Sequence, residues 1–289
     1  MNTLFKHFIL TRFNLIDLAN YHVSYDYVNS DEYLSKRFHL FDTYCFPSIS
    51  NQTNKNFTWI LLFNDKFPEK WKKKLEEYKQ ICPNMEFCYM PIIHEGKWKE
   101  SLTRVVKNEL NALENNPQYL LTTRFDNDDA LHFSFVDSIQ KHFLEHQEEA
   151  IINYANGLQY IPKYNILKNF RVINGHFGTL IEKNDNKIRT VLSFSHNPLP
   201  DDLPSVKSLR IKKRMWLESI HSTNVFNAAS FKPYHLFDDL FFIGFKYKNL
   251  NDFGIKQDIP RINFYVWKVF FKWFFSKLKI KIINNIFRR

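Results

Sequence analysis

Residues 119–131, YLLTTRFDNDDAL, join an apolar, β-favouring run to a group of three carboxylates. The first half predicts a buried strand, and Asp126, Asp128 and Asp129 follow where that strand would end. Carboxylate oxygens are the ligands that Mg²⁺ and Mn²⁺ prefer, and Mg²⁺ is usually held by one or two carboxylates together with substrate phosphates. The stretch therefore predicts a divalent-cation site at a strand end, in an enzyme whose donor substrate carries phosphate.

Helical and strand-like patterns alternate on both sides of this stretch. Helices are expected at 31–46, which Pro47 would end, and at 69–80, 99–115 and 133–147. Strands are expected at 8–11, 58–63, 85–90 and 150–154. Shorter strands are expected at 159–161, 178–182 and 190–194, inside an otherwise irregular segment, 155–215. The alternation predicts an α/β fold with a mainly parallel sheet flanked by helices.

The composition argues against the common glycine-rich phosphate loops. Only six of the 289 residues are glycine, and neither GxGxxG nor GxxxxGK[ST] occurs. We therefore expect a bound metal ion to mediate phosphate binding. The three cysteines form no CxxC pair and are odd in number, which predicts a reducing compartment. We expect neither a cleaved signal peptide nor a membrane-spanning helix.

The positive charge is concentrated in the C-terminal segment. Residues 246–289 carry 11 Lys and Arg against two Asp, whereas the remainder carries 29 Lys and Arg against 28 acidic residues. A near-neutral body argues against binding to nucleic acid. Residues 262–287 combine a broad aromatic and aliphatic face with a narrow lysine stripe, which predicts a C-terminal amphipathic helix on an anionic membrane surface. The alternative is a terminal helix packed on the core with its lysines outward.

Several other polar residues stand at predicted strand ends or in loops. Neutral imidazoles bind metals, so the candidate metal ligands beside the acidic cluster are His196 and His221. The candidate nucleotide contacts are Arg12, Asp65, Arg124 and Asp126. The candidate general bases for an acceptor hydroxyl are Asp201, Asp202 and Glu218. For the two histidines the alternative is a structural or exposed side chain, for Arg12 a surface charge, and for Asp65 a turn-initiating residue.

Four stretches together resemble the rhamnosyltransferase family of bacterial glycosyltransferases. They are ILTRFN at 9–14, RFHLFDTYCFPSISNQTNKNFTWILLFND at 37–65, TTRFDNDDAL at 122–131 and WLESIHSTN at 216–224. The second is also similar to the start of family-2 glycosyltransferases. The resemblance covers about residues 7–245. It implies a GT-A-like domain over 1–245, with a nucleotide-binding half at 1–131 and an acceptor half at 132–245. Residues 246–289 remain as a membrane-associating tail.

The resemblance also implies a nucleotide-sugar donor, Mn²⁺ or Mg²⁺ at the acidic cluster, and a nucleotide contact at Asp65. Asp65 is followed by Lys66 and Phe67 rather than by the second acid and the Gly-Ser usual in family 2. This departure puts the uridine-type contact in question.

The sequence thus predicts a glycosyltransferase that acts in surface polysaccharide synthesis at the cytoplasmic face of the cell membrane. It would move a sugar, with rhamnose as one candidate, from a nucleotide-diphosphate donor to a glycan or lipid-linked acceptor. Two alternatives stay open. One is a metal-dependent phosphodiesterase or phosphotransferase that uses the same acidic cluster. The other is a non-catalytic peripheral membrane scaffold whose functional part is the tail.

Overall fold

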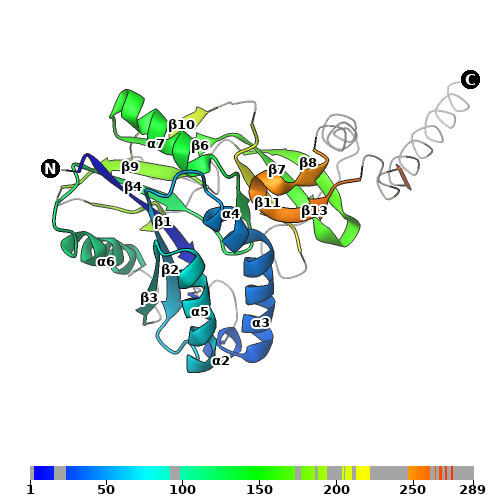
Figure 1. Ribbon diagram of the computed structural model, residues 1–289, viewed down its shortest axis with the longest axis horizontal. Helices are drawn as coiled ribbons and strands as arrows, with labels where there is room; N and C mark the ends of the chain where they lie inside the picture. Colours follow the sequence, from blue (N-terminus) through cyan, green and yellow to red (C-terminus); the bar gives the residue numbers. More distant parts are fainter. Residues whose placement is uncertain are drawn as a thin grey trace, which may run out of the picture.

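The computed structural model describes residues 3–15, 24–91, 98–172, 177–185, 188–193, 204, 206–209, 213–221 and 247–260, together with 264, 267, 268, 271 and 275. Within these residues the chain forms a mixed α/β structure around a seven-stranded sheet (Figure 1). The predicted α/β class, with a mainly parallel sheet flanked by helices, is confirmed.

The central sheet has the strand order β10-β6-β9-β4-β1-β2-β3. Its strands are β1 (Phe5–Arg12), β2 (Thr58–Asn64), β3 (Met85–Met90), β4 (Tyr119–Arg124), β6 (Ala150–Tyr154), β9 (Thr179–Lys183) and β10 (Val206–Leu209). The first four run parallel to one another, and β9 lies antiparallel between β4 and β6. The order β3-β2-β1-β4 reverses its direction between β1 and β4. Open α/β sheets bind ligands at such a switch point, outside the carboxyl ends of the strands.

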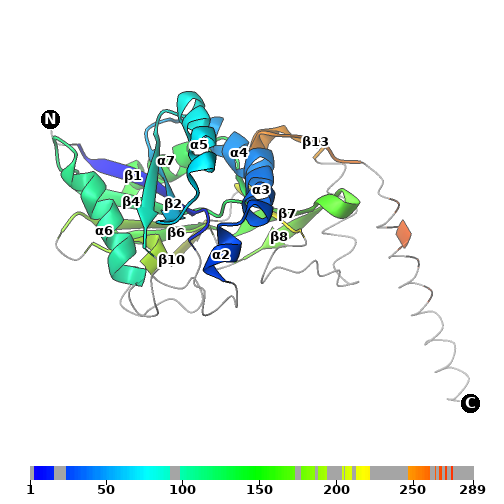
Figure 2. The ribbon, with the colours of Figure 1, turned by 90° about the horizontal axis from the view of Figure 1, so that it is seen from below.

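Helices cover both faces of this sheet. The helices α3 (Asp31–Leu40), α5 (Glu69–Ile81) and α7 (Phe135–His146) lie on one face, and α6 (Trp98–Asn111) lies on the other (Figure 2). Side chains alternate along each strand, so Ile9 packs in the core under α3, α5 and α7, whereas Leu10 packs against α6. The switch point between β1 and β4 is therefore enclosed by helices on both faces.

The helix predicted to end at Pro47 continues past it, so that prediction is wrong. After α3 the chain makes one π-helical turn, η1 (Phe41–Cys45), and then enters α4 (Phe46–Ser50) with Pro47 in its first turn. Proline is tolerated in a first turn because the N–H that it lacks would have no partner there. A π-turn is rare and is found most often near functional sites.

A second sheet, of order β5-β11-β7-β8, lies beside the first (Figure 1). Its strands are β5 (Ala130–Leu131), β11 (Trp216–Ser219), β7 (Asn156–Ile161) and β8 (Ile166–Arg171). β7 and β8 form a hairpin through the 3₁₀ turn η2 (Pro162–Tyr164), in a segment that was expected to be mostly irregular. The strand expected at 190–194 is instead the 3₁₀ turn η3 (Val191–Ser193), and α6 ends at Asn111 rather than at 115.

The first part of the segment predicted as a tail is folded against this second sheet. The strands β12 (Asn249–Leu250) and β13 (Ile255–Asp258) pair around the 3₁₀ turn η6 (Asn251–Phe253). Leu250, Phe253 and Ile255 are buried in one cluster with residues of β7 and β11. Most of the predicted C-terminal helix lies outside the described residues, although 264, 267, 268, 271 and 275 have helical backbone. None of the helices in the described part of the chain is long and apolar enough to cross a bilayer.

Candidate functional site

The acidic stretch turns at the carboxyl edge of the central sheet, at the switch point, and two of its side chains hold it from opposite directions. Asn127 Nδ2 donates a hydrogen bond of 2.7 Å to the carbonyl oxygen of Phe13, just after β1. Asp129 Oδ1 accepts a hydrogen bond of 2.8 Å from the backbone N–H of Ser219, on β11. The loop that carries the three acids is therefore fixed between the two sheets.

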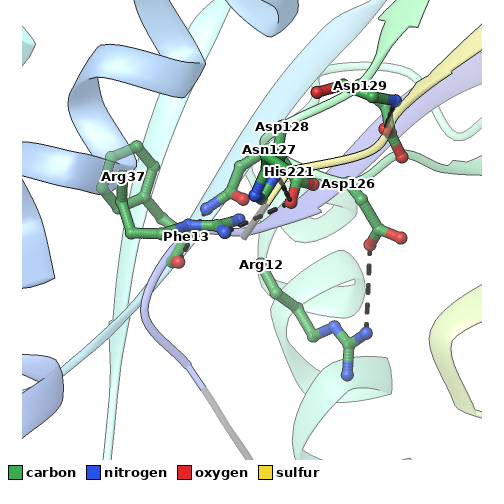
Figure 3. Close-up of polar contacts among 9 residues, drawn as sticks. Arg12, Phe13, Arg37, Asp126, Asn127, Asp128, Asp129 and His221 are labelled. Atoms are coloured by element: carbon green, nitrogen blue, oxygen red, sulfur yellow. Dashed lines mark hydrogen bonds and ion pairs between the residues drawn. The ribbon is translucent and has the colours of Figure 1, made fainter. Parts of the chain in front are cut away.

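Asp128 lies at the centre of the cluster and carries two partners on one oxygen (Figure 3). Its Oδ2 lies 3.2 Å from Arg37 Nη1 and 3.1 Å from His221 Nε2. All three side chains are largely buried, with 12–14% of their surface exposed. Burial alone would raise the pKa of Asp128, but the nearby Arg37 and His221 outweigh it and lower that pKa to about 2. Asp128 is therefore a carboxylate under all physiological conditions.

Asp126 occupies a more open position on another side of the loop. Its Oδ1 lies 3.9 Å from Arg12 Nη2, and the two side chains are 39% and 33% exposed. Figure 3 shows Asp126 directed toward Arg12 while Asp128 is directed toward Arg37. A half-exposed pair at this distance is weak, because water screens it. Asp126 is thus the carboxylate of the cluster that a ligand can engage at the lowest cost.

The side chain of Asp129 points away from both Arg12 and Arg37 (Figure 3). Burial, and then the negative charges of Asp128, Asp126 and Glu218, raise the pKa of Asp129 well above its usual value. The hydrogen bond that Asp129 Oδ1 accepts from the N–H of Ser219 joins the loop to β11. The geometry therefore favours a supporting role for Asp129, which holds the loop to β11.

The end of β11 brings a second group of polar residues beside the acids. Glu218 is buried, with 1% of its surface exposed, and accepts a hydrogen bond from Gln159 Nε2 on β7. Tyr44, from the π-turn η1, is hydrogen-bonded to Ser219 and packs on the ring of Tyr160 at 6.4 Å. The π-turn thus places Tyr44 next to β11, the strand that leads to His221.

The remaining nucleotide contacts predicted from the sequence lie along the same edge of the sheet. In the β1–β4 register Leu10 pairs with Arg124, so Arg12 and Arg124 project from neighbouring strands on the face covered by α6. Asp65 follows β2 and is exposed, and it accepts a hydrogen bond from the hydroxyl of Tyr25. Its neighbour Lys66 lies 4.7 Å above the Tyr25 ring.

The structure brings Arg12, Asp126, Asp128, Asp129 and His221 together, with Glu218 adjacent. Three other candidates, His196, Asp201 and Asp202, lie outside the described residues. The sequence interpretation assigned no role to Arg37, Tyr44, Gln159 or Ser219. Arg37 is the first residue of the stretch RFHLFDTY, but a basic residue on a helix is ordinarily a surface charge. Nothing in its spacing indicates that it reaches Asp128, 91 positions later.

The donor set is suited to a hard divalent cation that arrives with a phosphate ligand. Within the described part of the chain, no three His, Cys, Asp or Glu side chains are grouped tightly enough to hold a metal ion by themselves. Asp126 and Asp128 nevertheless supply two carboxylates, and His221 adds an imidazole next to Asp128. Mg²⁺ and Mn²⁺ sites of nucleotide enzymes commonly use one or two carboxylates and complete the shell with phosphate and water.

Comparisons with solved structures return Staphylococcus aureus TarS. The structure titled TarS 1–349 in complex with UDP-GlcNAc is 13% identical, with a TM-score of 0.42, and the match covers 79% of this chain and 62% of that one. A second TarS 1–349 structure is 13% identical, with a TM-score of 0.40 and coverages of 74% and 60%. The present chain thus spans less than two thirds of the length of these structures. A search of curated proteins finds no match.

A family profile described as "Putative rhamnosyl transferase" matches residues 6–233. The match includes β1 from Lys6 onward, the acidic stretch and β11, and therefore every described residue of the candidate site. The chain belongs to this rhamnosyl transferase family.

Proposed function

We propose that the protein transfers a sugar from a nucleotide-diphosphate donor to a glycan or lipid-linked acceptor, and that rhamnose is the first sugar to test. The observation that carries the proposal is the arrangement at the switch point. There Arg12 and Arg37 approach an acidic loop from different sides, and His221 lies next to Asp128. Cationic side chains and carboxylates side by side at a strand edge suit a metal–diphosphate ligand.

Different side chains of the site would bind the metal ion and the diphosphate. Asp126, Asp128 and His221 would hold Mn²⁺ or Mg²⁺, while Asp129 keeps the loop attached to β11. Arg12, and Arg124 from the next strand, present positive charge from the α6 face, and Arg37 presents positive charge from the α3 side. The diphosphate would lie between them at the edge of the sheet. When bound, the cation supplies a Lewis acid that offsets the negative charge of the departing nucleotide.

An acceptor hydroxyl also needs a base. Glu218 remains a candidate together with Asp201 and Asp202, and its burial beside Gln159 requires the acceptor to enter between the two sheets. Substituting each of the three by its amide and measuring transfer at saturating donor separates them. The base is the residue whose amide variant loses turnover while its donor affinity stays unchanged.

Ligand-induced stabilisation tests the donor class. Purified protein is heated with UDP, GDP, CDP or dTDP, each with and without Mn²⁺. A ligand at 100 times its Kd adds roughly 2.7 kcal/mol, which is a rise in melting temperature of about 4–5 °C for a chain of this size. Asp128→Asn should lose that rise and should lower transfer about 100-fold or more. Asp137→Asn, at an exposed position on α7, is the matched control. A panel in which no nucleotide diphosphate stabilises the protein contradicts the proposal.

The nucleotide product distinguishes sugar transfer from the alternative phosphodiesterase or phosphotransferase activity. A phosphodiesterase or phosphotransferase releases or transfers a phosphoryl group, whereas a glycosyltransferase leaves the nucleoside diphosphate intact. Two-metal phosphodiesterase sites hold their ions about 3.5–4 Å apart in a dense set of ligands. Incubation with donor and ³¹P NMR of the nucleotide product decide the question. Nucleoside diphosphate as the only new species supports sugar transfer, and nucleoside monophosphate supports the rival.

We further propose that the C-terminal segment attaches the enzyme to an anionic membrane surface at the cytoplasmic face. Among its described residues, Phe264, Phe271 and Phe275 are 91%, 45% and 61% exposed. Their spacing of seven and four residues puts them on one side of a helix, and the rings of Trp267, Phe271 and Phe275 stack in series. Exposed aromatic residues interleaved with lysines are typical of helices that lie in a lipid interface. The free cysteines Cys45, Cys82 and Cys88 suit the reducing side of that membrane.

Vesicle flotation tests this attachment. The full chain should float with vesicles that contain an anionic lipid, should bind less at high salt, and should stay in solution with purely zwitterionic vesicles. Deletion of residues 262–289 should abolish flotation while donor-induced stabilisation is kept. The triple variant Phe264→Ala, Phe271→Ala, Phe275→Ala, which keeps every lysine, should lose most of the binding. Undiminished flotation of the deleted protein would show that the segment is not a membrane anchor.

A further inference from the structure

Arg37 is a largely buried cation of the candidate site, and it is directed at the carboxylate that we assign to the metal. It extends from α3 to Asp128 Oδ2 at 3.2 Å, with 14% of its side chain exposed. The same oxygen is approached by His221 Nε2 at 3.1 Å. A cation that binds Asp128 must therefore share this carboxylate with the guanidinium of Arg37.

The guanidinium is held in place by its own helix. The neighbouring residues Leu34 and Phe38 are buried in the main core, and the Phe38 ring stacks on Trp71 at 4.8 Å. Ser30 caps the start of α3 by accepting from the N–H of Tyr33, which anchors the opposite end. Because α3 is fixed by this packing, Arg37 has little room to withdraw when a second positive charge arrives.

Arg37 also has donor capacity left over. Its Nε is buried and finds no acceptor among the described residues. A buried donor without an acceptor is unfavourable, and a guanidinium has the planar fork that matches phosphate oxygens. The side chain is thus equipped for one further acceptor of the kind that a diphosphate supplies.

We propose that Arg37 makes binding of the divalent cation at Asp128 conditional on the diphosphate. Without a nucleotide, the cation meets the fixed charge of Arg37 in a low-dielectric site, where repulsion is strong. With a nucleotide, the phosphate oxygens neutralise both positive charges and accept from Arg37. Arg37 is therefore a positioning residue that acts through Asp128 and the phosphates. This inference rests on the proposed donor class and adds the rule by which donor and metal bind together.

Binding of Mn²⁺ in the absence of any nucleotide tests the rule without relying on catalysis. Titration followed by the EPR signal of free Mn²⁺ is carried out on the wild type, Arg37→Gln and Lys36→Gln. Lys36 is exposed on the same helix and pairs with Glu32, so its variant controls for the loss of one positive charge from α3. We expect Arg37→Gln to bind Mn²⁺ about tenfold more tightly or better, and Lys36→Gln to match the wild type. An unchanged or weakened Mn²⁺ affinity of Arg37→Gln overturns the proposal.

Two further variants keep the test decisive. In Arg37→Gln with Asp128→Asn the gain in Mn²⁺ affinity should disappear, and a gain that persists would place the cation elsewhere and overturn the proposal. If circular dichroism shows that Arg37→Gln is unfolded, Arg37→Lys takes its place. Lys keeps the positive charge but lacks the planar fork of a guanidinium, so Mn²⁺ binding should stay weak. The affinity for the nucleoside diphosphate that stabilises the wild type, measured with Mn²⁺, should fall about tenfold. An unchanged affinity for that nucleotide in Arg37→Lys would count against Arg37.

The donor class and the role of Arg37 can be refuted separately. If no nucleotide diphosphate binds the wild type, the donor class is wrong, yet the Mn²⁺ titrations still report whether Arg37 opposes the cation. If nucleotide and Mn²⁺ bind the wild type together but Arg37→Gln changes neither affinity, the donor class stands and the role of Arg37 is refuted.

Discussion

The pH dependence of stability should carry the signature of one histidine, His7 on β1. Its side chain is buried, with 1% of its surface exposed, between the central sheet and α7. Nε2 lies 2.8 Å from Thr123 Oγ1, and Nδ1 lies 3.3 Å from Gln140 Nε2. The amide of Gln140 is oriented by its bonds to Asn56 O and from Asn54. Its nitrogen therefore faces Nδ1 as a donor, and a proton on Nδ1 would have no acceptor.

Burial lowers the pKa of His7 from 6.5 to about 3. The unfolded chain therefore binds a proton that the folded protein refuses between these two pH values. The stabilising contribution of the neutral ring is present above pH 6.5 and is lost as the pH falls toward 3. Each pH unit in this window removes about 1.4 kcal/mol. Acidification from pH 7 to pH 5 should thus lower the free energy of unfolding by about 2 kcal/mol through His7 alone.

Urea unfolding of the wild type and His7→Gln at pH 7, 6 and 5 isolates this contribution, because every other titrating group is common to both proteins. The stability difference between them should change by about 2 kcal/mol across the range, in the direction that favours the variant at low pH. His39→Gln, an exposed position on α3, should run parallel to the wild type. A stability difference between wild type and His7→Gln that stays constant from pH 7 to pH 5 would refute the argument.

Two further predictions concern buried groups with different roles. Burial raises the pKa of Glu182 to about 8 and outweighs the hydrogen bond from the N–H of Arg189, which lowers it. The pH dependence of stability that Glu182 causes therefore has the opposite sign to that of His7. As the pH rises from 5 to 7, the free energy of unfolding of the wild type should fall by about 2 kcal/mol relative to that of Glu182→Gln, as measured by urea unfolding. A difference between the two proteins that does not change with pH would contradict this. A Cβ at Gly157 would lie 2.2 Å from the buried indole of Trp216, so Gly157→Ala should destabilise the protein by about 2 kcal/mol or more. Because Trp216 opens the strand that leads to His221, transfer should fall as well, and wild-type activity in Gly157→Ala would show that β11 tolerates the shift.

The four parallel strands were predictable because each is a short apolar run bounded by polar residues. Their carboxyl ends were predictable too, because the polar residues that follow them, such as Arg12, Asp65 and Asp126, interrupt those runs. The alternation with helices then required a mainly parallel sheet. The C-terminal helix and the roles of the individual site residues remain predictions.

Other elements could not be predicted from local pattern. The π-turn at Phe41–Cys45 has no periodicity of its own, so Pro47 looked like a helix end when it is a helix start. The strand β7 lacks the strict alternation of a half-buried strand, because it is buried on both faces. The role of Asn127 depends on a carbonyl that is 114 positions away.

The sequence by itself determined where the acids stand relative to a strand, because strand length, burial and the polar stop are local properties. It also determined the family, since the order of four short motifs is written in the chain. Only the tertiary structure decided what each acid faces. Asp126 meets Arg12, Asp128 meets Arg37 and His221, and Asp129 meets Ser219. The physical reason is that a buried charge takes whichever partner the packing of α3 and β11 brings to it, and that packing joins parts of the chain about 90 positions apart.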